Sequence, residues 1–255
     1  TSSTCCIMHV MSLKHDSFKK LRKDKNKWKV ETPEEFDERE NTFLKERLQS
    51  KEPTIYTTVR ITAGKAKNFT LEVPKATRPM TDRMKVRVFD ILKEDIVNKR
   101  VLDLYAGAGS FGLEALSRGA RSCTFVDASK NAVFVIERNI VHTGFLPESE
   151  VRREKVDDYL LKEINSEQKN AFDIVFIDPP YKLFNTKKVF KMENTINMAS
   201  ELLTGVIDRN TNKFRGALIL KHPKRYDLDK LRLNHIKVVE SINLGLNIIS
   251  FFIVK

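Results

Sequence analysis

A glycine-rich segment directly after a short apolar run is the feature that most constrains the fold of this chain. The run Val101–Tyr105 is typical of a buried strand, and Gly107-Ala108-Gly109-Ser110-Phe111-Gly112 follows it with the spacing G-x-G-x-x-G. We expect a helix over 113–117 and then a strand over 123–126 that ends at Asp127. A strand, a glycine loop, a helix and an acid in this order predict that a nucleotide-type ligand binds at the start of a βαβ unit.

Patterns typical of helices and strands alternate from residue 84 to the end of the chain. Helices are expected over 84–97 and 130–141, further strands over 172–177 and 217–220, and a terminal antiparallel pair over 236–242 and 247–254. Such alternation predicts an α/β fold in which helices cover both faces of a mostly parallel sheet. Ligands of these sheets bind at the carboxyl ends of the strands.

Two classes of cofactor fit the glycine loop. Glycines let the backbone approach either a dinucleotide or S-adenosylmethionine, and Asp127 could accept hydrogen bonds from the ribose of both. Asp103 discriminates between them, because a carboxylate there would repel a pyrophosphate but could pair with the α-amino group of adenosylmethionine. Asp103 could also simply cap the loop by accepting hydrogen bonds from backbone amides. The charge argument favours adenosylmethionine.

A second motif, Asp178-Pro179-Pro180-Tyr181, follows the predicted strand over 172–177. The prolines lack N–H groups and stiffen the turn, which leaves the Asp178 carboxylate and the Pro179 carbonyl as acceptors. Two acceptors could bind both hydrogens of the exocyclic amine of a base and direct its lone pair toward a methyl donor. Tyr181 could stack on an extruded base. A rigid turn with a core aromatic is the alternative, but the position downstream of the glycine loop favours catalysis.

The charge balance indicates the class of partner. The net charge is +12, which favours nucleic acid, with an anionic membrane surface or a merely solvated face as alternatives. The three cysteines have neither the pattern of a disulfide framework nor zinc-ligand spacing, so we expect a reducing compartment and no metal. No apolar run reaches the roughly 18 residues of a membrane span, and we expect nucleic acid rather than a membrane as the partner.

Before residue 84 we expect two basic segments, followed by one catalytic domain over 84–255. Residues 1–52 form a basic extension, helical over about 33–48, whose start is compatible with a frayed tail or with the remnant of an organelle transit peptide. Residues 53–83 have strand-like runs on either side of a loop over 64–68, as in a β-hairpin. From Arg60 to Arg87 there are eight Lys or Arg and two acids, so this hairpin could follow a phosphate backbone, although a solvated face has equal weight.

Over about residues 59–255 the sequence resembles the bacterial RsmD-type methyltransferases, which methylate N2 of a guanine in small-subunit ribosomal RNA. The resemblance lies in Val59–Lys65, in Arg78-Pro79-Met80-Thr81-Asp82-Arg83, in the stretch from Leu102 to Ala120, in Asp178–Tyr181 and in Leu244 to Phe252. It implies the class I methyltransferase fold, with a seven-stranded sheet whose last strand is antiparallel. It also implies a monomer that uses S-adenosylmethionine and binds ribosomal RNA or a small-subunit assembly particle.

The resemblance assigns roles to individual residues. The catalytic residues would be Asp178, Pro179, Pro180 and Tyr181. The cofactor would be bound by Asp103, Tyr105, Ala106, Gly107, Gly109, Gly112, Asp127, Ala128 and Asp157. The RNA would be bound by Arg60, Lys65, Lys67, Arg78, Thr81 and Arg83.

The sequence departs from the family at several positions. The acid of an Asp-Ala pair that contacts the cofactor adenine is replaced near Lys155-Val156, and Asp157 or Asp158 could take its place. The family has a Glu after its fifth strand where Lys221 stands, and a Tyr-Gly where Leu244-Gly245 stands. These changes leave Asp178–Tyr181 intact but weaken any assignment of the target nucleotide.

Three other functions fit parts of the sequence. The motif Asp178–Tyr181 also serves adenine-N6 methyltransferases of DNA or RNA, although no separate target-recognition region is evident. The glycine loop also fits a dinucleotide oxidoreductase, and a non-catalytic RNA-binding protein could keep the fold. We expect a cytoplasmic location, or an organelle if residues 1–52 derive from a transit-bearing precursor.

Overall fold

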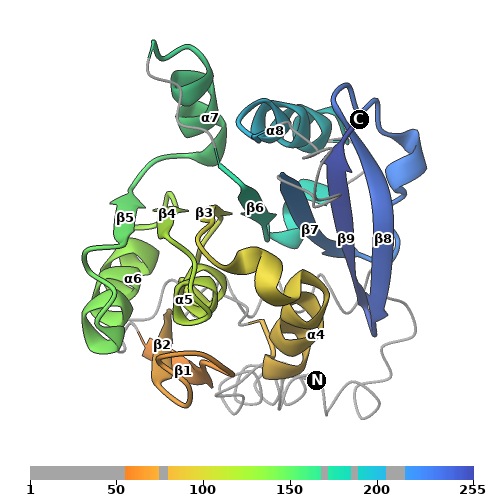
Figure 1. Ribbon diagram of the computed structural model, residues 1–255. Helices are drawn as coiled ribbons and strands as arrows, with labels where there is room; N and C mark the ends of the chain where they lie inside the picture. Colours follow the sequence, from red (N-terminus) through yellow and green to blue (C-terminus); the bar gives the residue numbers. More distant parts are fainter. Residues whose placement is uncertain (1–54, 75–79, 168–171, 185–188, 205–215) are drawn as a thin grey trace, which may run out of the picture.

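The computed structural model describes residues 55–74, 80–167, 172–184, 189–204 and 216–255 (Figure 1). The expected extension over 1–52 and the predicted RNA-binding residue Arg78 lie outside the described residues. Within the described part of the chain, no helix combines the length and the apolar character that a membrane crossing needs.

The main sheet has seven strands in the order β5-β4-β3-β6-β7-β9-β8. All neighbouring pairs from β5 to β7 are parallel, and β9 is antiparallel to both β7 and β8. This arrangement confirms the predicted α/β fold and its antiparallel last strand. The strands are β3 Arg100–Leu104, β4 Ser122–Val126, β5 Ser149–Arg152, β6 Ile174–Ile177, β7 Ala217–Pro223, β8 Ile236–Leu244 and β9 Asn247–Val254.

Helices cover both faces of the sheet, α4, α5 and α6 on one side and α7 and α8 on the other (Figure 1). Their bounds are α4 Asp82–Leu92, α5 Ser110–Ser117, α6 Lys130–Thr143, α7 Val156–Ile164 and α8 Val189–Glu201. The helix expected over 84–97 ends earlier as an α-helix and continues as a 3-10 turn, Lys93–Ile96. β5, α7 and α8 were not predicted; β5 is short, polar and only half-buried, and therefore lacks the apolar run of an inner strand.

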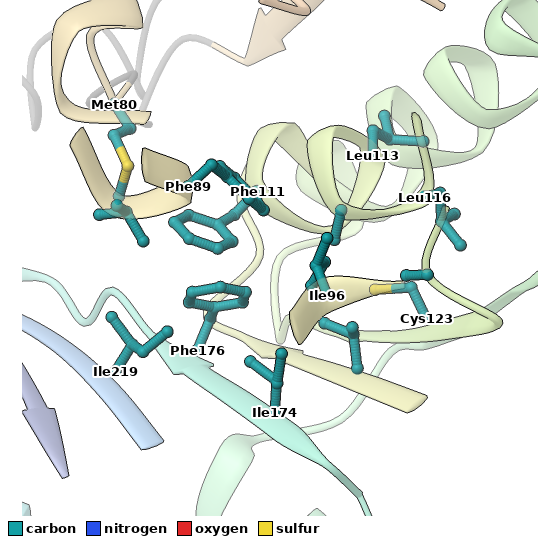
Figure 2. Packing of buried hydrophobic residues seen from close by; sticks show 14 of the residues in the cluster. Met80, Phe89, Ile96, Phe111, Leu113, Leu116, Cys123, Ile174, Phe176 and Ile219 are labelled. Carbon is teal, nitrogen blue, oxygen red and sulfur yellow. The ribbon is translucent and has the colours of Figure 1, made fainter. Parts of the chain in front are cut away.

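Two hydrophobic cores follow from the alternation of side chains along the strands. On β6, Phe176 belongs to the core under α4, α5 and α6, whereas Val175 and Ile177 belong to the core under α7 and α8. Figure 2 shows Phe176 beneath Phe89 of α4 and Phe111 of α5, with rings close together. These aromatic contacts hold α4 and α5 over the carboxyl half of β6.

The predicted hairpin is present as β1 Ile55–Arg60 and β2 Thr70–Pro74, which pair antiparallel in a separate sheet. Its connecting loop packs on the last turn of α5: the Lys65 N–H donates to the Ser117 carbonyl at 2.7 Å. Gly64 is required at this contact, because its φ is +83° and an added Cβ would lie 1.9 Å from the same carbonyl oxygen. The loop is therefore held against α5.

A buried ionic network also holds the connecting loop of the hairpin against α5. The Glu114 carboxylate of α5 accepts hydrogen bonds from the Thr62 N–H at 2.8 Å and from the Arg118 guanidinium at 2.9 Å. The ammonium of Lys85, fully buried on α4, lies 3.4 Å from Glu114 and also donates to the Arg60 carbonyl. A buried charge is tolerated when it is paired and hydrogen-bonded, so this network links α4, α5 and the hairpin.

Candidate active site

A cleft of about 830 Å³ opens at the carboxyl ends of β3, β4, β6 and β7. This volume lies in the range of sites that bind small molecules and cofactors. The walls of the cleft contain all four predicted catalytic residues, Asp178, Pro179, Pro180 and Tyr181. They also contain seven of the nine predicted cofactor-binding residues: Asp103, Tyr105, Ala106, Gly107, Asp127, Ala128 and Asp157.

Asp103 lies on β3 at the floor of the cleft and is only 2% exposed. Its carboxyl accepts a hydrogen bond from the Gly112 N–H in the first turn of α5 at 3.0 Å. Burial raises its pKa to about 8, against the opposing effect of that hydrogen bond, and the nearby Asp178 and Asp127 carboxylates add to the rise. Asp103 thus both caps the glycine loop and faces the cleft, so the two sequence-based interpretations describe one residue.

Asp127 lies directly after β4 and contacts the glycine loop. Its carboxylate accepts hydrogen bonds from the Gly107 N–H at 2.9 Å and from the Ser129 N–H at 2.8 Å. Burial raises its pKa, and these two hydrogen bonds oppose the rise. The acid predicted to bind a ribose is therefore also the residue that shapes the loop.

Gly109 and Gly112, the other two predicted cofactor-binding residues, are not among the residues that line the cleft. A Cβ on Gly112 would lie 2.3 Å from the Phe125 ring and 2.4 Å from the Cys123 sulfur, both on β4. Gly112 therefore lets α5 pack closely on the sheet. Of the motif's glycines, Gly107 lines the cleft, whereas Gly112 serves the packing of α5 on β4.

Asp178 follows β6 immediately, and the backbone N–H of Asp178 donates to the Leu104 carbonyl at 3.3 Å. Its two carboxylate oxygens accept hydrogen bonds from the ammonium of Lys221 at 2.7 and 2.8 Å. Lys221 comes from β7, where it follows Leu220, the register partner of Ile177. The sequence shows Lys221 as a departure from the family, but only the pairing of β6 with β7 reveals that it meets Asp178.

Tyr181 begins a 3-10 turn, Tyr181–Phe184, and is 8% exposed. It packs in the core under α7 and α8 and also lines the cleft. Tyr181 is therefore a core residue that also lines the cleft, and its stacking on a base stays a prediction.

Asp157, at the start of α7, also lines the cleft, and two side chains of α8 bind its carboxylate. The Thr195 hydroxyl donates to one of its oxygens at 2.7 Å, and the Lys191 ammonium lies 3.2 Å from the other. Burial, and next the Asp157 carboxylate, raise the pKa of Tyr105, which lines the same wall with φ of +59°. Asp158 also lines the cleft, so the choice between the two acids stays open.

The described residues of the predicted RNA-binding set lie outside the cleft. Arg60, Lys65 and Lys67 are exposed on the hairpin, and Arg83 is exposed in the first turn of α4. Thr81 is the N-cap of α4, where its side chain accepts from the Met84 N–H. The end of the hairpin nevertheless reaches the site, because Pro74 and Met80 line the cleft.

Sequence reasoning missed the lysines that line the cleft, Lys155, Lys182, Lys191 and Lys221. A chain with 46 Lys and Arg carries no local signal that would single out these four. The described residues contain no group of three or more His, Cys, Asp or Glu side chains placed to bind a metal ion.

Comparison with known proteins shows which of them this chain resembles. A family model described as "Conserved hypothetical protein 95" matches residues 59–218. The chain is 36% identical over 126 residues to the ribosomal RNA small subunit methyltransferase D of Haemophilus influenzae, covering 48% of this chain and 64% of that protein. Alignments to curated proteins of that name cover 58% to 67% of their length.

Solved structures share the fold. A hypothetical protein of Thermus thermophilus is 28% identical and has a TM-score of 0.59, covering 76% of this chain and 98% of its own. SMU.776, assigned as a methyltransferase and crystallised with SAH, is 17% identical with a TM-score of 0.58, covering 80% of this chain and 57% of its own. At that identity the second likeness concerns the fold alone.

Proposed function

Because the chain belongs to the RsmD-type family of ribosomal RNA methyltransferases, we propose that it methylates the N2 amine of a guanine in small-subunit ribosomal RNA with S-adenosylmethionine. The observation that carries the proposal is the shared cleft: Asp178–Tyr181 and the glycine loop with Asp103 face the same space from neighbouring strands. The amine acceptors and the cofactor loop therefore stand on adjacent sides of one cavity.

The residues of the cleft fit a cationic cofactor. Asp103, Asp127 and Asp157 line its cofactor side, where a pyrophosphate would meet like charges and an α-ammonium group would meet an opposite one. Asp103 would hold the amino group and Asp127 the ribose. When bound, adenosylmethionine supplies a sulfonium methyl group: as the nitrogen–carbon bond forms, the carbon–sulfur bond breaks and its electron pair stays on sulfur.

The protein contributes position and electrostatics to this transfer. The Asp178 carboxylate and the Pro179 carbonyl accept hydrogen bonds from the amine, which directs the nitrogen lone pair toward the methyl group. The methylated nitrogen then carries one surplus proton, which leaves through the Asp178 carboxylate to solvent. Tyr181 offers an aromatic face to the base.

The hairpin, within residues 53–83, is the element that we propose for RNA binding, and residues 84–255 are the catalytic domain. Exposed Arg60, Lys65, Lys67 and Arg83 would contact phosphates and, with the net charge of +12, would make binding steeply dependent on salt. The buried network around Glu114 would hold these cations in register with the cleft.

The test is transfer of a labelled methyl group from adenosylmethionine to small ribosomal subunits, or their RNA, from cells that lack the enzyme. We expect N2-methylguanosine at one site, identified by mass, and none with the Asp178→Ala variant. Duplex DNA and adenine-containing RNA are the comparison substrates. N6-methyladenine as the only product would replace the proposal by the adenine-directed alternative, and no incorporation despite bound cofactor would support a non-catalytic protein.

A further inference from the structure

Lys221 has an unusual position for a lysine. It continues an apolar strand, β7, whose preceding residues Leu218, Ile219 and Leu220 are at most 2% exposed, and its own side chain is 7% exposed. Burial strips water from an ammonium, which is unfavourable unless a paired group replaces that water. The pairing is with Asp178, the residue that we assign to the amine, and both groups line the cleft.

The geometry leaves part of the ammonium available to a ligand. An ammonium has three N–H donors, and the two oxygens of Asp178 take two of them. Among the residues that the structure describes, the ammonium of Lys221 has no other hydrogen-bond acceptor. Each oxygen of Asp178 keeps lone-pair capacity for a further donor. Asp178 and Lys221 therefore present an acceptor and a donor side by side, 2.7 Å apart.

This pair matches one edge of guanine. The N2 amine of guanine is a donor, and the neighbouring ring nitrogen N3 is an acceptor bonded to the same carbon. We propose that Lys221 donates a hydrogen bond to N3 while Asp178 accepts one from the N2 amine. The inference rests on the proposed function and extends it by naming the residue that recognises the ring beside the target amine.

The alternative is that Lys221 only orients Asp178. The two roles make different predictions for a substrate that lacks N3. If Lys221 contacts N3, removing either partner costs the same interaction, and removing both costs nothing more. If Lys221 acts only through Asp178, its loss and the loss of N3 are independent and their effects multiply.

The experiment combines Lys221→Met with a small-subunit RNA in which 3-deazaguanosine replaces the target guanosine. The full chain is assayed for kcat/KM with both RNAs. We expect Lys221→Met to lower kcat/KM on guanosine by about 10- to 100-fold, the usual cost of a hydrogen bond to a charged group. We expect wild type to lose a similar factor on 3-deazaguanosine, and the variant to lose less than about threefold more on the analogue.

Three controls define the result. Lys237→Met, a lysine exposed on the edge strand β8, should match wild type. Lys221→Gln keeps an uncharged donor and should recover part of the loss. Affinity for S-adenosylhomocysteine and the melting temperature report whether the cofactor side and the fold survive each substitution.

The outcomes separate the inference from the proposed function. Multiplying losses, or equal activity of Lys221→Met and wild type on guanosine, would overturn the contact with N3 while leaving guanine methylation intact. A wild-type protein that transfers no methyl group to guanosine would overturn the proposed function, and the role of Lys221 with it.

Discussion

The two sides of the cleft each contribute an aspartate, Asp103 and Asp178, and these two carboxyl groups differ in burial and in hydrogen-bond partners. Asp103, on the cofactor side, is 2% exposed and is hydrogen-bonded to a backbone amide. Asp178, on the side assigned to the base, has a side chain that is 28% exposed and is paired with the ammonium of Lys221. Asp103 lies within β3, opposite Phe176 of the neighbouring strand β6, whereas Asp178 follows the end of β6, so the two carboxyl groups differ in burial and in partners.

This difference has a chemical consequence. With its pKa raised to about 8, Asp103 can lose its proton when a cationic group of a ligand arrives beside it. Asp178 already has a cation, so the pair that it forms with Lys221 is suited to hydrogen bonding with a neutral base. Asp103 would thus gain a cationic partner only when the cofactor binds, whereas Asp178 has a cationic partner, Lys221, before the substrate binds.

Asp178→Ala should give the largest effect, a loss of methyl transfer without a loss of cofactor binding. We expect kcat for methyl transfer to fall by about a thousandfold or more, since a positioned acceptor at the reacting atom is lost. Affinity for S-adenosylhomocysteine, measured by calorimetry, should stay within about threefold of wild type. Activity near the wild-type value would contradict the assignment of Asp178.

Asp103→Asn should give a smaller effect, on cofactor affinity rather than on kcat. The amide keeps an acceptor for the Gly112 N–H but cannot carry the negative charge that pairs with the α-amino group. We expect affinity for S-adenosylhomocysteine to fall by about 10- to 100-fold, the cost of a charge-assisted hydrogen bond. The kcat at saturating cofactor should change little. Unchanged affinity would show that Asp103 serves only the glycine loop.

The pH dependence of stability should reveal a third effect, on folding rather than on catalysis or cofactor binding. Because the folded-state pKa of Asp103 is raised from 3.8 to about 8, the cofactor-free native protein keeps a proton that the unfolded chain releases between these values. Its contribution to stability is full below pH 3.8 and is lost as the pH rises toward 8, by about 1.4 kcal/mol per pH unit. Urea unfolding of wild type and Asp103→Asn at about pH 5 and about pH 7.5 measures it.

The variant should therefore lose less unfolding free energy than wild type between these two pH values. Asn cannot titrate, and the rest of the chain is the same in both proteins, so the difference isolates Asp103. Parallel pH profiles would mean that the Asp103 carboxyl has an ordinary pKa, and the contrast between the two sides of the cleft would then rest on Lys221 alone.

Much of the site was predictable from local sequence. Gly107 and Asp127 belong to a spacing that follows from the length of a βαβ unit, and Asp178–Tyr181 directly follow an apolar run. Gly112 shows the limit of such reasoning: the motif assigned it to the cofactor, whereas in the structure it packs against Phe125 and Cys123 and does not line the cleft.

The sequence by itself determined most of the alternation of strands and helices, without β5, α7 and α8, together with the terminal antiparallel pair, the glycine loop and the motif Asp178–Tyr181. Each of these depends on residues close together in the chain. The tertiary structure decided which distant charges meet. Lys221 reaches Asp178, and Lys85 reaches Glu114, only through the register of β7 on β6 and the packing of α4 on α5. A lysine has the same local pattern on a surface as beside a carboxylate, so its partner, and with it its role, appears only when the fold brings the two together.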